Sequence, residues 1–139
     1  MFQNIFLTPA GLIYILPDSN IKGYFMKDFI KVIKALSEPN RVKILKMLQH
    51  RAMYVCEMQE ALEVAQPTVS KHLKVLEDAG MVSYTKDGFW VSYHLTDGSG
   101  SPYAASMLGN LKHWLDDDAE IALIGEKLPD IMRKNICKK

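Results

Sequence analysis

The segment between residues 55 and 95 constrains the fold of this chain more than any other. Its apolar pattern predicts a short helix, a turn of three or four residues, a second helix and then a two-stranded hairpin. Two helices joined by so short a turn must cross at a steep angle, as they do in a helix-turn-helix. The second of these helices carries the most information.

This second helix has a clear beginning, a clear apolar side and a clear end. Pro67 suits the first helical position because it has no N–H to leave unpaired, so Gln66 is expected at the cap. Gly80 stands where a helix end favours a left-handed residue. One apolar stripe, which is expected to pack on the domain, consists of Val69, Leu73 and Leu76.

The hairpin is predicted from two β-rich segments, residues 81–85 and 89–95, on either side of Lys86, Asp87 and Gly88. Asp-Gly is a strong hairpin turn signal, and it puts Lys86 at the tip. The whole layout is that of a winged helix-turn-helix, mainly α with a small β wing, which places its second helix in the major groove of DNA. The polar residues expected to meet bases and phosphates are Gln66, Thr68, Ser70, Lys71, His72, Lys74 and Lys86.

Three segments, residues 35–45, 55–58 and 66–76, together with the hairpin, resemble the ArsR (ArsR/SmtB) family of metalloregulators. The resemblance extends over about residues 26–114. It implies a homodimer, paired through its first and C-terminal helices, that binds an inverted-repeat operator in double-stranded DNA and represses transcription. It also implies an inducer, often a metal or metalloid, that releases the protein from DNA.

The cysteines match the family's arsenite site only in part. Arsenite-sensing members carry Cys-Val-Cys where this chain has Tyr54, Val55 and Cys56, so the first thiolate is absent. Soft metalloids prefer two or three sulfur ligands, and the second cysteine here is Cys137 in the C-terminal tail. Cys56 and Cys137 of the same or of different subunits are therefore candidate ligands for arsenite, antimonite or another soft metal ion, or partners in a disulfide. The alternative is a buried structural Cys56 and an incidental Cys137.

The zinc site of other family members is present as a fragment. His113 and Asp116 are spaced to share one helical face, but Ser101 and Pro102 stand where the family's earlier pair of ligands would fall. Two ligands are half a zinc site. We therefore expect His113 to be an ordinary interface or surface histidine.

Composition narrows the function classes. The 139 residues carry a net charge of +1, with 48% apolar and 24% charged residues, which fits a single globular domain. Charge is uneven, however. Residues 27–51 hold seven Lys and Arg against two acidic residues, whereas residues 112–130 hold two Lys against six acidic residues. Such a distribution can turn a basic face toward phosphates, but a solvated charged face explains it equally well.

The sequence has no Gly-rich phosphate loop, nucleophile elbow or His-Glu metal motif, so we do not expect an enzyme. It has no apolar run of membrane-spanning length and no basic n-region of a signal peptide, which favours a cytoplasmic protein that does not enter a membrane.

We expect three parts. Residues 1–25 form an irregular extension, either an accessory arm or the product of an upstream translation start. Residues 26–116 form the DNA-binding and dimerisation domain, and residues 117–139 form a helical segment with a basic tail. Two alternatives to a metal-responsive repressor remain at this point. One is a redox- or sulfur-responsive repressor that uses its two cysteines, and the other is a winged-helix interaction module that does not bind DNA.

Within the middle part, helices are expected at residues 27–36 and from Pro39 onward. A long helix is expected from Pro102, with Ser101 as its cap and an apolar side that continues to Leu115.

Overall fold

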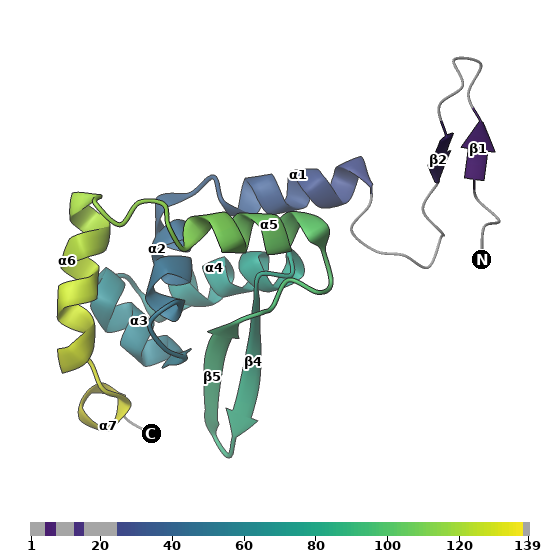
Figure 1. Cartoon of the computed structure of the whole chain (residues 1–139). Helices are drawn as coiled ribbons and strands as arrows, with labels where there is room; N and C mark the ends of the chain where they lie inside the picture. Colours follow the sequence, from purple (N-terminus) through teal and green to yellow (C-terminus); the bar gives the residue numbers. More distant parts are fainter. Residues whose placement is uncertain (1–4, 8–12, 16–24, 138–139) are drawn as a thin grey trace.

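A computed structural model describes residues 5–7, 13–15 and 25–137 of the chain. Its helices pack around one core, and the narrow hairpin of residues 82–95 projects from them (Figure 1). The elements are β1 (Ile5–Leu7), β2 (Ile13–Ile15), α1 (Met26–Ala35), α2 (Pro39–Leu48), β3 (Met53–Tyr54), α3 (Val55–Leu62), α4 (Gln66–Asp78), β4 (Val82–Asp87), β5 (Trp90–Leu95), α5 (Pro102–Leu111), α6 (Ala119–Lys127), the 3₁₀ turn η1 (Leu128–Asp130) and α7 (Arg133–Ile136).

The N-terminal extension contains regular structure. β1 and β2 pair antiparallel, with Ile5 opposite Ile15. The expectation of an irregular segment is therefore wrong for these two strands, each of which consists of three consecutive, largely apolar residues that pair with the other strand. The remainder of the extension up to residue 24 lies outside the described residues, as do Lys138 and Lys139 of the predicted basic tail.

The predicted apolar stripe of α4 is confirmed. Val69, Leu73 and Leu76 are at most 1% exposed and belong to a core that also includes Ile44 of α2 and Met58 of α3. Burial of side chains of this size stabilises a domain by about 1.5–3 kcal/mol each. The stripe therefore fixes which face of α4 points inward.

The ends of α4 were predicted to within one residue. Its cap is Ala65, which has extended backbone angles, and not Gln66 as expected. Pro67 is thus the second helical residue, a position equally free of an N–H partner within the helix. Gly80 follows the helix with a φ of +77°, which confirms its predicted role. The preceding turn is also confirmed, because α3 ends at Leu62 and α4 begins at Gln66.

The wing differs from the prediction in two details. Asp87 pairs with Trp90, so the turn consists of Gly88 and Phe89, and Lys86 lies within β4 opposite Val91. Lys86 is therefore not at the tip; Gly88 takes the positive φ of +62° that the turn requires. The sheet also has a third strand, because β3 pairs with β5 to give the order β3-β5-β4.

Helix α5 begins as predicted but ends early. The Ser101 hydroxyl accepts a hydrogen bond from the Ala104 amide at 3.2 Å, which confirms the cap. The helix ends at Leu111, and Leu115 has a left-handed φ of +67°. The expected apolar side through Leu115 is therefore wrong.

Lys46 of α2 explains this ending. Its Nζ donates to the carbonyls of Leu111 and Trp114, both at 2.9 Å, and to the Asp116 carboxylate at 2.7 Å. The lysine thus binds carbonyls that the end of a helix leaves unpaired. His113 and Asp116 consequently share no helical face, and Asp116 is already held by an ammonium group, which removes the basis of the half zinc site.

Residues of the basic segment form ion pairs with residues of the acidic segment. Lys43 of α2 contacts Glu120 of α6 at 3.4 Å, and Lys46 contacts Asp116. Two lysines of the basic segment are therefore paired with carboxylates of the acidic segment, whereas contact of the basic segment with phosphates stays a prediction.

Asp116 gives the fold a testable dependence on pH. Its hydrogen bond from Lys46, together with the charges of Lys46, His113 and His50, holds its pKa below the ordinary 3.8. A carboxyl whose pKa is lowered by folding stabilises the fold above its unfolded pKa, and this contribution is lost as the pH falls through the folded pKa. We expect Asp116→Asn to reduce the fall in Tm on acidification below about pH 4. Thermal unfolding of both proteins across this range measures the difference, and identical slopes would contradict the prediction.

Candidate nucleic-acid interface

The outer face of α4 is polar and centred on Lys71. At 100° per residue, Lys71 lies nearly opposite the buried stripe of Val69, Leu73 and Leu76. Its side chain and that of Lys74 are exposed. A helix whose apolar side is wholly buried can present only this face to a ligand.

The other predicted contact residues flank Lys71. Gln66 and Ser70 lie on one side, where the Gln66 amide donates to the Ser70 hydroxyl at 2.9 Å. Thr68, half-buried, lies on the other side. Amides and hydroxyls can both donate to and accept from base edges. The bond between Gln66 and Ser70 holds two such groups in one orientation at the start of the helix.

His72 takes a different position from the other predicted residues. Its side chain is 14% exposed, and its Nε2 lies 3.6 Å from a Glu38 carboxylate oxygen. Its Nδ1 lies 3.4 Å from Arg41 Nη1. Glu38 is also the cap of α2, where it accepts the Arg41 amide at 3.0 Å. The imidazole therefore joins α4 to the beginning of α2.

Lys74 is exposed but paired. Its Nζ lies 3.1 Å from Asp78 and 3.8 Å from Glu77, one turn further along α4. The hydrogen bond and charge of Asp78, followed by the charge of Glu77, raise the pKa of Lys74. The lysine thus remains charged, while the two carboxylates make the second half of α4 less attractive to phosphates than the first.

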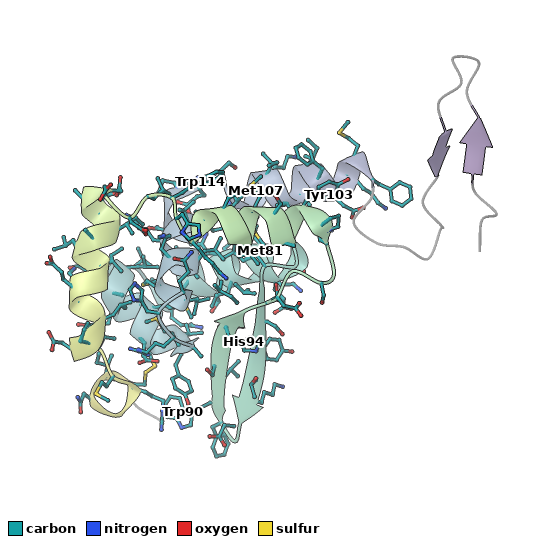
Figure 2. All side chains as sticks on the ribbon, in the orientation of Figure 1. Met81, Trp90, His94, Tyr103, Met107 and Trp114 are labelled. Carbon is teal, nitrogen blue, oxygen red and sulfur yellow. A yellow bond between two sulfur atoms is a disulfide. The ribbon has the colours of Figure 1, made fainter. Side chains whose placement is uncertain are left out.

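The wing carries a group of residues that the sequence reasoning missed. Trp90 meets the Tyr54 ring edge-on at a centroid distance of 5.9 Å, and Arg133 of α7 lies over Trp90 at 4.6 Å (Trp90 is labelled in Figure 2). Phe89 forms the tip and is 87% exposed. No local pattern reveals the arginine contact, because Arg133 lies more than forty residues from Trp90 in the sequence.

The two cysteines meet within one chain. Cys56, in the first turn of α3, forms a disulfide with Cys137, with the Cα atoms 5.4 Å apart. The hypothesis that the tail reaches Cys56 is confirmed, and the alternative of an incidental Cys137 is wrong. The part of the chain that the structure describes holds no cluster of three or more His, Cys, Asp or Glu suited to a metal ion.

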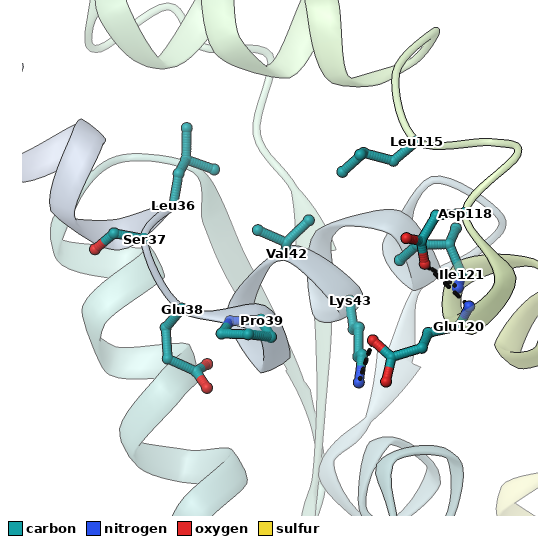
Figure 3. A pocket seen from close by; sticks show the side chains of 10 residues that line it. All are labelled: Leu36, Ser37, Glu38, Pro39, Val42, Lys43, Leu115, Asp118, Glu120 and Ile121. Atoms are coloured by element: carbon teal, nitrogen blue, oxygen red, sulfur yellow. Dashed lines mark hydrogen bonds and ion pairs between the residues drawn. The ribbon is translucent and has the colours of Figure 1, made fainter.

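A pocket of about 350 Å³ lies between the beginning of α2 and α6 (Figure 3). Its apolar lining includes Leu36, Val42 and Ile121, and the Lys43–Glu120 ion pair stands at its side. Glu38 also lines it and contacts His72 of α4. The pocket is therefore adjacent to the residues that support the outer face of α4.

Comparisons with family models and with curated proteins identify the same family. The family described as "Bacterial regulatory protein, arsR family" matches residues 31–84. An uncharacterized HTH-type transcriptional regulator of Methanocaldococcus jannaschii is 40% identical over 68 residues, which is 48% of this chain and 76% of that protein. The arsenic resistance transcriptional regulator ArsR1 of Pseudomonas putida is 32% identical over 101 residues, 69% of this chain and 79% of the relative.

Other relatives are matched over a smaller share of their length. The HTH-type transcriptional repressor SmtB of Mycobacterium tuberculosis is 40% identical over 67 residues, which is 48% of this chain and 50% of SmtB. The chain thus spans about half the length of this curated relative.

Solved structures show the same fold. HlyU from Vibrio cholerae N16961 is 29% identical with a TM-score of 0.52, over 61% of this chain and 88% of HlyU. The transcriptional repressor BigR from Xylella fastidiosa is 25% identical with a TM-score of 0.55, over 66% of this chain and 88% of BigR. Among the described residues, no helix has the length and apolar character needed to cross a bilayer.

Proposed function

Because this chain belongs to the arsR family of bacterial regulatory proteins, we propose that it is a homodimeric winged helix-turn-helix repressor of an inverted-repeat operator. The observation that carries the proposal is the geometry of α4. Its apolar stripe is fully buried, its polar face around Lys71 is exposed, and a three-residue turn joins it to α3. This is how a recognition helix is presented to the major groove.

The proposed contacts divide by chemistry. Gln66, Thr68 and Ser70 meet base edges, because amides and hydroxyls can read donor and acceptor patterns there. Phosphates are bound by Lys71, with smaller contributions from Lys74 and from Lys86 on the wing. We assign His72 a supporting role, since its ring is largely buried between α4 and α2.

The dimer is proposed to form through α1 and α5, which lie side by side along one face of the molecule (Figure 1). Phe29 of α1 packs edge-on against Tyr103 of α5 at 5.4 Å. Contiguous exposed apolar residues mark interaction sites, and the large ones on α1 and after α5 are Met26, Phe29, Ile30, Ile33, Trp114 and Leu115. Two copies joined here would present two α4 helices to successive major grooves, about 34 Å apart.

The inducer is proposed to be a soft metal or metalloid, such as arsenite or antimonite. Two relatives of this chain are named for cadmium and arsenic resistance. The sulfur donors available in this chain are Cys56 and Cys137, which must be reduced to thiolates before they can bind such an ion. We also propose a cytoplasmic location, because a repressor of a genomic operator acts where the chromosome is.

Fluorescence anisotropy tests the proposed function. We expect the purified chain to bind labelled DNA from its own upstream region at least about 10³-fold more tightly than random DNA of equal length. Arsenite, Cd²⁺ or Zn²⁺ is then titrated into the reduced complex, with Cys56→Ser as the control. Equal affinity for both DNAs at moderate salt would instead support an interaction module whose helix-turn-helix is a scaffold.

A further inference from the structure

We propose that Cys56 and Cys137 form a reversible redox site that controls how firmly the C-terminal segment braces the wing. The C-terminal strap is defined here as residues 128–137, which comprise η1, α7 and Cys137. Its consequence for operator binding rests on the proposed function, whereas its effect on the wing does not.

The strap joins parts of the molecule that are distant in sequence. Its disulfide holds it to the first turn of α3 across a separation of 81 residues. Four residues before Cys137, Arg133 lies over two aromatic rings, 4.6 Å from the centroid of Trp90 and 5.1 Å from that of Tyr54. Trp90 begins β5 and Tyr54 ends β3, so this one arginine contacts two strands of the wing sheet.

A second arginine ties the strap to the beginning of α3. Arg51 donates to the Ile131 carbonyl of the strap and, at 2.9 Å, to the Glu57 carboxylate. Glu57, whose side chain is 3% exposed, also accepts the Tyr54 amide at 2.8 Å. The strap, the first turn of α3 and strand β3 thus share one hydrogen-bond network.

The position of Cys56 suits thiol chemistry. It is the second residue of α3 and half-buried, so the positive end of the helix favours its thiolate while small oxidants and thiols can reach it. Disulfides in a reducing compartment are usually transient and redox-sensing. We therefore expect this one to open and close.

The chemistry balances with a hydroperoxide as oxidant. One thiolate attacks the peroxide oxygen to give a sulfenic acid and release an alcohol or water. The other thiol then displaces water from the sulfenic sulfur and closes the disulfide. Two thiols are oxidised and one peroxide is reduced. A dithiol reverses the reaction by exchange, leaving two protein thiols and its own cyclic disulfide.

Reduction leaves the strap with non-covalent contacts. Helix α7 has four residues, too few to be stable without tertiary contacts. Without the bond to Cys56, Arg133 leaves the two rings more often and the wing loses its brace to α3. Because a pre-organised binding surface loses less conformational freedom on binding, we expect the oxidised protein to bind the operator about five-fold more tightly than the reduced protein.

Hydrogen exchange of the full chain tests the strap directly. Amides of residues 82–95 should exchange at least about three-fold faster in dithiothreitol than after treatment with hydrogen peroxide. Cys137→Ser should give the fast exchange under both conditions. Arg133→Gln should keep the disulfide, verified by intact mass, and still give the fast exchange, because it removes the contact with Trp90 and not the covalent bond.

The outcomes separate the two proposals. Equal amide exchange of the wing in the oxidised and reduced wild type would overturn the proposal that the disulfide controls the bracing of the wing, whatever the DNA result. Faster wing exchange with unchanged operator affinity would overturn the redox control of DNA binding. If neither redox form prefers the operator over random DNA, the proposed function fails, and the exchange measurement still decides the strap.

Discussion

Replacement of Lys71 by alanine is expected to lower operator affinity by about 10- to 100-fold at low salt. Lys71 stands at the centre of the exposed face of α4, opposite the buried stripe. Each phosphate contact contributes about 0.9 to the slope of log K against log salt concentration. Both protomers of the proposed dimer carry the change, so the slope should fall by about 1.8, as measured by anisotropy between about 50 and 300 mM salt.

Lys112→Ala is the matched control. Lys112 is exposed and its replacement removes the same charge, but it follows α5 and is remote from α4 in sequence. It should retain the wild-type slope. An unchanged slope and affinity for Lys71→Ala would remove Lys71 from the interface, and an equal loss in both variants would show that net charge alone is being measured.

Lys46→Met should destabilise the fold by about 3 kcal/mol, because loss of one partner of a buried polar group leaves the others unpaired. The side chain of Lys46 is 6% exposed, and its ammonium group binds the carbonyl of Leu111, the last residue of α5, and that of Trp114 in the segment that follows. Methionine replaces the apolar stem and leaves both carbonyls without this donor. Urea unfolding monitored by circular dichroism measures the change, and the Tm should fall by roughly 10 °C.

Lys43→Met provides the comparison within the same helix. Lys43 forms an ion pair with Glu120, whose side chain is 70% exposed. An ion pair of this kind contributes less than about 1 kcal/mol. If the two variants prove equally stable, the hydrogen bonds of Lys46 contribute no more to stability than the exposed ion pair of Lys43.

Local signals were sufficient to predict the elements that present the recognition face. The spacing of Val69, Leu73 and Leu76 determined the buried side of α4, and Gly80 marked its end. Ser101 and Pro102 marked the beginning of α5. Such features act over a few residues, so a single sequence displays them.

The features that were missed depend on contacts between distant residues. At the early end of α5, the Leu111 carbonyl is bound by Lys46, which lies 65 residues earlier in the sequence. Strand β3 has two residues, too few to show a strand pattern, and exists because β5 lies beside it. The position of His72 follows from Glu38 and Arg41, which no property of α4 reveals. Pairing of Cys56 with Cys137 was one of several alternatives until the fold brought them together.

The ion pairs that α2 makes with α6 and with the segment before it have a consequence for how this protein would find its target. Lys43 and Lys46 neutralise acidic neighbours, and the whole chain carries a net charge of +1. Long-range attraction and sliding along DNA both depend on a strongly positive surface. A nearly neutral repressor instead searches the chromosome mainly by diffusion through solution, and occupancy of its operator depends on its copy number and on short-range contacts.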